Sequence, residues 1–202
     1  SRPTIGFIGL GLLGGAMVER LIARGFDVIG FDIVQDRISA LKVRGCRSAA
    51  SPAAVCQAAD RVLMCVTTSD AVSDVVTGAD GVMAGGRLDG KVLVDHSTTD
   101  INLTRALAQK LADATGMAFV DAPLSGGPDA ARGGTLAIMA GGDDAVIEGL
   151  RPVLEHLGRL TRMGPIGTGQ ATKLVNQTLV LSNYCVIAEA LQLARSFGVD
   201  AA

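Results

Sequence analysis

Short apolar segments alternate with helical patterns along most of the chain. Strands are predicted over residues 4–8, 27–31, 61–66, 92–95, 118–121, 136–140 and 160–163. A helix is predicted over residues 14–24 and another over 101–114, where apolar side chains at positions 103, 107, 108 and 111 repeat with a helical period. This alternation predicts an α/β fold with a doubly wound, mostly parallel sheet and right-handed crossovers.

The pattern changes after residue 163. Residues 164–169 are rich in glycine and proline, which break regular structure. Residues 170–197 contain no glycine or proline, and Gly198 then suits the end of a helix. Apolar side chains occupy almost the whole circumference of this predicted helix, so it has to be covered on several sides. Because residues 199–202 cannot cover it, we expect either further chain or a second subunit to pack there.

Composition limits the classes of partner. Hydrophobic residues make up 49% of the 202 residues and aromatic residues only 3%, so the core has to be built from Ala, Val, Ile and Leu. The formal net charge is −2, and no run of Lys or Arg forms a basic stripe. These features argue against nucleic acid or an anionic membrane as the main partner, but they are compatible with a small anionic ligand held by local dipoles.

Cysteine usage and the first apolar segment bear on the compartment. The four cysteines form no C-x-x-C pair, and with two histidines in the chain we expect no metal site. We interpret the cysteines, which are Cys46, Cys56, Cys65 and Cys185, as small buried thiols in a reducing compartment.

The first apolar segment is interrupted by glycines and followed by Glu19 and Arg20, which is untypical of a signal peptide or a membrane span. A soluble, cytoplasmic protein is therefore expected.

A glycine motif follows the first predicted strand and opens the first predicted helix. In this context the spacing G-x-G-x-x-G is typical of a dinucleotide-binding turn. The first glycine allows a tight turn, the second lets the backbone approach the pyrophosphate, and the third lets helix and strand pack closely. Free N–H groups at the helix N-terminus then bind the phosphates. The alternative is a glycine-rich turn without a ligand. The predicted cofactor-binding residues here are Gly9, Leu10, Gly11, Leu12, Leu13 and Gly14.

Asp32 ends the second predicted strand, where an acidic residue binds the adenosine ribose in such folds. A carboxylate there repels a 2′-phosphate, and Arg37 is the nearest cation that could accommodate one. We therefore predict NAD as the cofactor, with NADP left possible. The alternative for Asp32 is a strand-end residue that caps the following helix.

Four stretches have the order and spacing of one enzyme family across almost the whole chain. They are Gly6-Phe7-Ile8-Gly9-Leu10-Gly11 with Gly14; Asp95-His96-Ser97-Thr98; Asp121-Ala122-Pro123-Leu124-Ser125-Gly126-Gly127 with Gly133-Gly134-Thr135-Leu136; and Gly167-Thr168-Gly169-Gln170 leading into Lys173-Leu174-Val175-Asn176-Gln177. In them the chain resembles the β-hydroxyacid dehydrogenases, which include 3-hydroxyisobutyrate dehydrogenases and tartronate semialdehyde reductases.

The resemblance implies a division into two domains. Residues 1–164 would form a Rossmann-type dinucleotide-binding domain, and residues 165–202 would form a long interdomain helix that opens an all-helical second domain. Members of the family are usually longer than this chain. We therefore expect the second domain to be truncated here, and the missing part to contribute to the cofactor and substrate pockets.

The resemblance also implies a catalytic lysine at Lys173, with Asn176 as a second catalytic residue. Lys173, Asn176 and Gln177 lie at i, i+3 and i+4, so one helix face carries a cation and two amides that can hold and protonate a carbonyl oxygen. Burial against apolar neighbours would lower the pKa of Lys173 for proton transfer near neutral pH. The alternative is a solvated surface lysine. The Asn176-Gln177 pair looks more like the tartronate semialdehyde reductases.

Three further segments would complete the site. The resemblance makes Ser125-Gly126-Gly127 a clamp for the substrate carboxylate, in which exposed backbone N–H groups and a hydroxyl bind the anion; a plain turn is the alternative. It places Ser97 and Thr98 beside the nicotinamide and the substrate. It also implies cofactor contacts at Val66 and Thr67, although the resemblance leads us to expect a proline where this chain has Thr67. Residues 99–101 and 128–132 also depart from the family and border the substrate pocket.

These expectations combine into one function. We expect an oxidoreductase that transfers a hydride between a nicotinamide cofactor and a small 3-hydroxy acid or its semialdehyde, of the 3-hydroxyisobutyrate or 2-hydroxy-3-oxopropionate type. The substrate-binding residues would be Ser125, Gly126, Gly127, Lys173, Asn176 and Gln177. An imine reductase-like enzyme and a non-catalytic dinucleotide-binding scaffold are the alternatives, and Lys173 argues against both. We also expect a dimer or tetramer formed through the helical domain.

Overall fold

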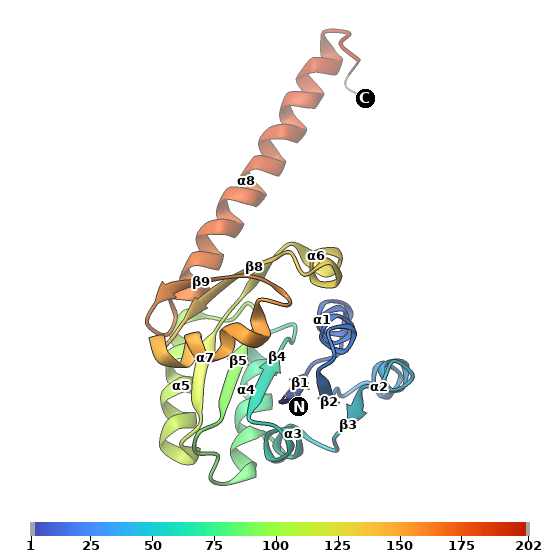
Figure 1. Cartoon of the computed structure of the whole chain (residues 1–202). Coiled ribbons are helices and arrows are strands. Elements are labelled where there is room, and N and C mark those ends of the chain that lie inside the picture. The colour runs from blue at the N-terminus through green and yellow to red at the C-terminus, as the bar shows by residue number, and fades with distance from the viewer. Residues whose placement is uncertain (1–2, 201–202) are drawn as a thin grey trace.

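The computed structural model describes residues 3–200, and within them nine strands form one sheet with helices on both faces (Figure 1). The strands are β1 (Thr4–Ile8), β2 (Asp27–Phe31), β3 (Arg47–Ser48), β4 (Arg61–Met64), β5 (Val92–Asp95), β6 (Ala118–Asp121), β7 (Leu124–Ser125), β8 (Leu136–Gly141) and β9 (Gly158–Gly164). The helices are α1 (Leu12–Ala23), α2 (Gln35–Lys42), α3 (Pro52–Ala58), α4 (Ser69–Thr77), the 3-10 helix η1 (Val82–Gly85), α5 (Ile101–Thr115), α6 (Gly127–Gly133), α7 (Asp144–Leu154) and α8 (Thr168–Ser196).

The strand order is β3-β2-β1-β4-β5-β6-β8-β7, with β9 beside β8. All pairs from β3 to β6 are parallel, whereas β8 runs antiparallel to β6 and β7. The order reverses between β1 and β4, which places a topological switch point at the carboxyl ends of these two strands. The predicted α/β class with a doubly wound, mostly parallel sheet is confirmed.

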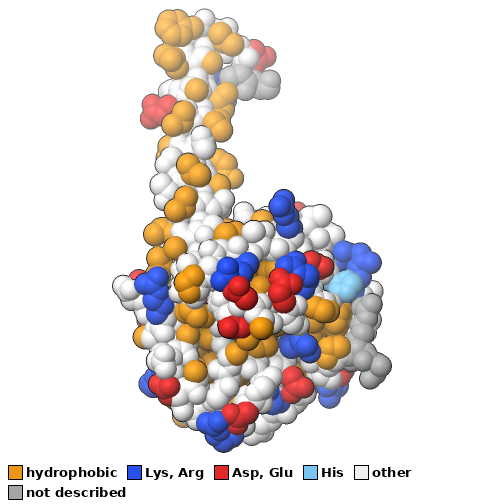
Figure 2. Space-filling model, turned by 60° about the vertical axis from the view of Figure 1, so that its left-hand side comes forward, with side chains coloured by type: hydrophobic (Ala, Val, Ile, Leu, Met, Phe, Trp, Pro, Cys, Tyr) orange, Lys and Arg blue, Asp and Glu red, His pale blue; other side chains and the backbone are white. Residues whose placement is uncertain are grey.

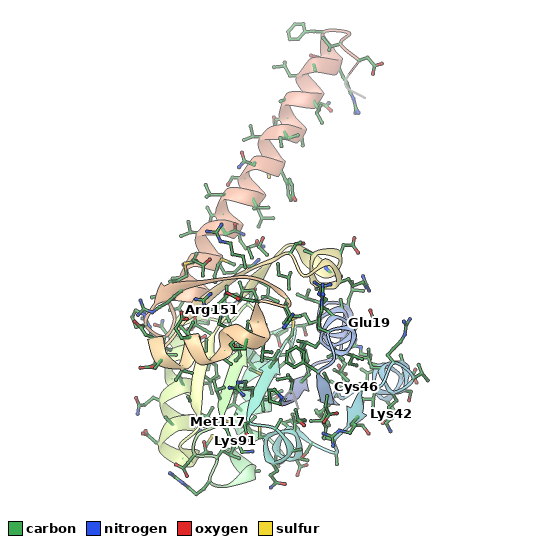
Figure 3. The ribbon with its side chains drawn as sticks, viewed as in Figure 1. Glu19, Lys42, Cys46, Lys91, Met117 and Arg151 are labelled. Atoms are coloured by element: carbon green, nitrogen blue, oxygen red, sulfur yellow. The ribbon has the colours of Figure 1, made fainter. Side chains whose placement is uncertain are left out.

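Two apolar cores lie on opposite faces of the sheet because successive strand side chains point to opposite faces. In β5, Val92 and Val94 join the core under α1, α6 and α7, whereas Leu93 joins the core under α3, α4 and α5. Such strands are buried on both faces, which explains their continuous apolar runs. In Figure 3, Lys91 and Met117 lie near the amino ends of β5 and β6, opposite the edge from which α8 leaves.

Several boundaries differ from the sequence prediction. Strand β4 ends at Met64, two residues early, because the N–H of Val66 donates to the hydroxyl of Ser97 instead of to a strand. Helix α1 begins at Leu12, inside the glycine motif of residues 9–14, rather than at residue 14. The two-residue strands β3 and β7 were not predicted, since so short a segment carries no periodicity.

Helix α8 packs on the body only through its first turns. Gly169, Gln170 and Lys173 are buried, whereas Leu174, Leu179 and most of the following residues are exposed. Figure 1 shows the helix running away from the sheet, and Figure 2 shows apolar side chains along its length. By length and composition α8 could cross a membrane, and none of its most apolar stretch is buried. Residues 3–200 do not supply the expected cover, so that expectation stays a prediction.

Candidate active site

The glycine turn between β1 and α1 has the geometry that its sequence predicts. Gly9 has φ +91°, and a Cβ there would collide with the carbonyl O of Cys65. A Cβ at Gly14 would collide with the carbonyl O of Gly9, so glycine is needed for helix and strand to pack. At Gly11, by contrast, the nearest atom to an added Cβ would be Arg37 Nη1 at 3.8 Å. Gly11 therefore faces open space that a ligand can enter.

This open space belongs to a cavity of about 210 Å³ at the switch point of the sheet. Its lining includes five of the predicted cofactor residues: Gly9, Gly11, Asp32, Val66 and Thr67. Helix α1 begins at the cavity with Gly11 as its N-cap, and no side chain accepts a capping hydrogen bond there. The first N–H groups of the helix, at Leu12 and Leu13, can therefore bind an anion. A cradle that an added side chain would fill, next to an uncapped helix end, fits a dinucleotide pyrophosphate.

Asp32 is held in a fixed orientation at the edge of this cavity. Its Oδ2 accepts a hydrogen bond from the backbone N of Leu10 at 2.7 Å, and its Oδ1 accepts one from Val34 N at 2.8 Å. Arg37 Nη1 lies 3.4 Å from both oxygens. Leu10 is itself buried, and its backbone N–H donates to Asp32. In this structure Leu10 therefore orients the Asp32 carboxylate. A carboxylate has about four acceptor positions, which leaves capacity for ribose hydroxyls.

Lys173 projects from the second turn of α8 toward the segment that follows β6. It is 9% exposed, and its Nζ donates to the carbonyl O of Leu124 at 2.7 Å. Burial lowers the pKa of Lys173. No carboxylate within residues 3–200 lies within ion-pair distance of it, unlike Lys91, whose Nζ lies 3.1 Å from Asp60. The amine is therefore buried without a compensating charge, which is the condition that favours its neutral form.

The Leu124 carbonyl brings Lys173 next to the predicted carboxylate clamp. Ser125 follows directly and is half-buried, and Gly126 and Gly127 adopt φ values of +127° and +73° at the start of α6. An added Cβ at Gly127 would meet nothing within 4 Å, so the backbone there is open to a ligand. The N-cap residue Gly126 has no side chain to cap the helix. Exposed N–H groups in this conformation suit an anionic oxygen.

The remaining predicted residues lie around the same helix turn. Asn176 and Gln177 are half-buried on the face of α8 that carries Lys173, and Asn176 Nδ2 lies 3.5 Å from Gln177 Oε1. Thr98 is exposed on the loop after β5. This loop contacts α8 through Gln170, so Thr98 and Lys173 come from neighbouring segments. Their roles as cofactor and substrate residues stay predictions.

Sequence reasoning missed a buried polar network beneath this site. The carboxylate of Asp121 accepts from the backbone N of Gly167 at 2.7 Å and of Gln170 at 2.9 Å, and so fixes the start of α8. The carboxylate of Asp95 accepts from Ser97 N at 2.9 Å. Burial raises the pKa of Asp95 to about 6 and also raises that of Asp121. An acidic residue ending each of two buried strands was the available signal.

His96 is a second buried group that was not singled out. Its Nδ1 lies 2.7 Å from the carbonyl O of Ala122, and burial lowers its pKa to about 4. A neutral ring must donate from Nδ1 to that carbonyl, which leaves Nε2 as an acceptor. Nε2 is buried and has no partner among residues 3–200. Within the same residues no cluster of three or more His, Cys, Asp or Glu side chains suits a metal ion.

Comparison with known proteins places this geometry in a family. The model that describes the NAD binding domain of 6-phosphogluconate dehydrogenase matches residues 4–169. The chain belongs to this family. Its homologues are 3-hydroxyisobutyrate dehydrogenases and related β-hydroxyacid dehydrogenases.

Two curated relatives cover nearly the whole chain. A probable 3-hydroxyisobutyrate dehydrogenase-like 3, mitochondrial, of Arabidopsis thaliana is 37% identical over 200 residues, which are 99% of this chain and 62% of that protein. The mitochondrial 3-hydroxyisobutyrate dehydrogenase of Mus musculus is 35% identical over 201 residues, which are 99% of this chain and 59% of that protein. The chain thus spans about three fifths of the length of these relatives.

Solved structures share the fold. The 3-hydroxyisobutyrate dehydrogenase of Mycobacterium tuberculosis with L-serine is 34% identical, has a TM-score of 0.90, and is matched over all of this chain and 68% of its own length. Psf3 in complex with NADP+ is 28% identical with a TM-score of 0.89, over 97% of this chain and 69% of that one. An imine reductase from Pseudomonas sp., at 21% identity and a TM-score of 0.88, covers 99% and 69% respectively and shares the fold.

Proposed function

We propose that the full-length protein is a nicotinamide-dependent dehydrogenase or reductase that acts on a small 3-hydroxy acid or its semialdehyde. The observation that carries the proposal is Lys173, a buried amine with a lowered pKa and no compensating carboxylate within residues 3–200. Its amine lies beside a clamp suited to a carboxylate. The Nζ donates to the carbonyl O of Leu124, and Leu124 directly precedes Ser125, the first residue of the clamp. A hydroxyl β to a carboxylate would thus meet the amine while the carboxylate meets the clamp.

The chemistry divides between cofactor and protein. A nicotinamide, when bound, accepts a hydride from the alcohol carbon or returns it to the carbonyl carbon. Neutral Lys173 takes the hydroxyl proton during oxidation, and protonated Lys173 gives it back to the oxygen during reduction. Asn176 and Gln177 hold the same oxygen. Ser125, Gly126 and Gly127 bind the substrate carboxylate and fix which carbon faces the cofactor.

For the cofactor we propose NAD bound across the cavity at the β1–β4 switch point. The pyrophosphate would rest on the turn from Gly9 to Gly14 and the ribose on Asp32. Val66 and Thr67 would line the path toward the nicotinamide, and Thr98 would lie beside that ring. Arg37, within 3.4 Å of Asp32, is the group that would accommodate a 2′-phosphate, so NADP is the competing ligand.

We infer the two-domain division that the sequence predicts, with residues 1–164 as the dinucleotide-binding domain and residues 165–202 as the start of a helical domain. Of these, residues 1, 2, 201 and 202 lie outside the part of the chain that the structure describes. The apolar surface of α8 supports further chain or a second subunit as its cover. A homo-oligomer formed through this region and a cytoplasmic location remain part of the proposal. The two curated relatives above are named as mitochondrial.

The alternatives differ in what Lys173 does. An imine reductase-like enzyme would act without a lysine at this position, and a non-catalytic scaffold would bind the dinucleotide without turnover. A buried, uncompensated lysine favours acid–base chemistry over both, because a buried amine without a partner carboxylate is costly to keep charged and such perturbed pKa values cluster at functional sites.

A turnover screen tests the proposal. The full-length protein is incubated with NAD or NADP and 3-hydroxyisobutyrate, L-serine or, as controls, 2-hydroxy acids, and separately with NADH or NADPH and cyclic imines. Nicotinamide absorbance is followed in both sets. We expect reduction of the cofactor with at least one 3-hydroxy acid and none with the 2-hydroxy acids. Turnover of imines alone, or binding of cofactor without any turnover, would replace the proposal with one of the two alternatives.

A further inference from the structure

The side chain of Gln170 joins two parts of the candidate site that are distant in sequence. Gln170 lies in the first turn of α8 and is 2% exposed. Its Oε1 accepts a hydrogen bond from the backbone N of Thr99 at 3.1 Å, and its Nε2 donates to the carbonyl O of Ser97 at 2.8 Å. One amide thus binds the two backbone groups that flank Thr98.

The loop after β5 is shaped by this amide. Ser97 and Thr99 are buried, whereas Thr98 between them is exposed. From the sheet side the carboxylate of Asp95 holds the same loop, because it accepts from Ser97 N at 2.9 Å and from Thr99 Oγ1 at 3.0 Å. The loop is therefore fixed from two directions, with Thr98 at its outer surface.

The start of α8 has its own anchor on the neighbouring strand. Asp121 accepts from the backbone N of Gly167 and of Gln170, and it is the register partner of Asp95. The two carboxylates thus fix two separate segments to adjacent strands of the sheet. The Gln170 amide adds a direct connection between these segments.

Lys173 lies one helical turn after Gln170 and is buried with it. Residues three apart share a helix face, so a shift of the first turn of α8 against the loop would carry Lys173 with it. The distance from Thr98 to Lys173 therefore depends on the two hydrogen bonds of the Gln170 amide.

We propose that Gln170 is a positioning residue, which holds Thr98 and Lys173 at the separation that hydride and proton transfer require. The inference rests on the proposed function of Lys173 as the acid–base group and of Thr98 beside the nicotinamide. It adds a residue that touches neither substrate nor cofactor.

The test replaces the amide with an apolar side chain of similar size, Gln170→Leu, in the full-length protein. Misplacing a catalytic group by about 1 Å can cost about 10²-fold in rate. We expect kcat to fall by about 10–10²-fold, while the dissociation constant for the dinucleotide changes less than about 3-fold, because Gly11 and Asp32 are untouched. Gln109→Leu is the matched control, since Gln109 is an exposed glutamine whose amide bonds Asp113 on the same helix, and it should leave kcat unchanged.

A second readout separates positioning from a merely structural role. The pH dependence of kcat for oxidation reports the pKa of Lys173, as does NMR titration of its labelled ε-carbon, assigned by its loss in Lys173→Ala. If Gln170→Leu frees the first turn, water reaches Lys173 and its midpoint moves up toward that of an ordinary lysine. A purely structural role would lower the melting temperature and leave the midpoint and kcat of the folded protein as in the wild type.

Gln170→Glu keeps the test valid if the leucine variant does not fold. The introduced side chain, when ionised, can accept from Thr99 N but repels the carbonyl O of Ser97, whereas its protonated form donates to that carbonyl and restores both bonds. We expect the ratio of variant to wild-type kcat to rise as the pH falls. A ratio near one at every pH would overturn the inference.

The outcomes also separate this inference from the proposed function. If the wild type is active, Lys173→Ala is inactive and Gln170→Leu is folded with wild-type kcat and midpoint, the positioning role is wrong and the proposed function stands. If the wild type turns over no 3-hydroxy acid, or Lys173→Ala stays active, the proposed function fails and takes the positioning role with it.

Discussion

The side-chain Nζ of Lys173 donates to the carbonyl O of Leu124 at 2.7 Å, across 49 residues of sequence. This bond sets the amine beside Ser125 and gives it a neutral partner rather than a carboxylate. A lysine whose charge is stabilised by a carbonyl is easier to deprotonate than one in an ion pair. The way in which α8 packs on the sheet thus gives Lys173 a partner that suits acid–base chemistry.

The first prediction follows from this pairing. Lys173→Ala should lower turnover by about 10²–10⁴-fold, the usual range for losing a positioned acid–base group, and leave dinucleotide affinity nearly unchanged. Lys173→Arg should also fail in oxidation, because arginine keeps the charge and cannot deprotonate. Steady-state kinetics and fluorescence titration measure the two quantities. Lys110→Ala, at an exposed lysine on α5, is the control. Wild-type turnover by Lys173→Ala would make Lys173 a structural residue.

The second prediction contrasts two glycines of the same turn. Gly11→Val should leave the melting temperature almost unchanged and weaken dinucleotide binding, because its side chain enters the open cavity where the pyrophosphate is expected. Gly14→Ala should instead destabilise the fold, because its Cβ would collide with the carbonyl O of Gly9. Thermal melts with and without NADH measure both effects. Unchanged NADH affinity in a folded Gly11→Val would contradict the placement of the pyrophosphate.

The third prediction concerns cofactor choice. The wild type should bind NADH more tightly than NADPH, because the fixed carboxylate of Asp32 repels a 2′-phosphate. Like charges about 4 Å apart cost on the order of 1–4 kcal/mol, so Asp32→Asn should narrow the preference by about 10-fold. Fluorescence titration with both dinucleotides measures it. If NADPH binds the wild type as well as NADH does, Asp32 is not the ribose ligand and Arg37 takes the phosphate.

The fourth prediction is a pH dependence of stability caused by His96. Its pKa is about 4 in the folded protein against 6.5 for an ordinary histidine, so the unfolded state binds more protons between these values. Stability due to this residue is therefore present above pH 6.5 and lost as the pH falls toward 4, with a slope of up to about 1.4 kcal/mol per pH unit.

Asp95 acts in the opposite sense, because its raised pKa of about 6 makes the folded state the better proton binder between that value and 3.8. The two effects cancel in part in the wild type. Comparison with His96→Gln isolates the histidine, since Asp95 is common to both proteins. The difference in free energy of unfolding, from urea titrations at several pH values, should fall as the pH falls from 6.5 to 4. Parallel curves would show that the buried ring is not the cause.

The fifth prediction concerns α8. Its exposed apolar residues cover too much of its circumference for stable contact with water, so further chain or a second subunit should bury it. Hydrogen exchange on the full-length protein measures protection of residues 181–196, and light scattering coupled to size-exclusion chromatography measures whether the full-length protein and the 202-residue chain associate. Unprotected residues 181–196 in the full-length protein would contradict the prediction.

The sequence by itself determined the class of fold and the glycine turn between β1 and α1. Continuous apolar runs alternate with helical periods, and this local pattern depends on burial rather than on any particular partner. The roles of Gly9 and Gly14 also followed from sequence, because backbone conformation and close packing at those positions admit no side chain. The spacing of Lys173, Asn176 and Gln177 placed them on one helix face, as observed.

Only the tertiary structure decided how the two halves of the candidate site meet. Which carbonyl Lys173 bonds, and that Gln170 closes on the loop around Thr98, depend on contacts across 49 and more than 70 residues that leave no periodic signal. Asp95 and Asp121 stand at the ends of adjacent strands because of the strand order, which sequence pattern does not specify. Their carboxylates are buried with backbone N–H groups as partners, and it is this long-range hydrogen bonding that turns separate motifs into one site.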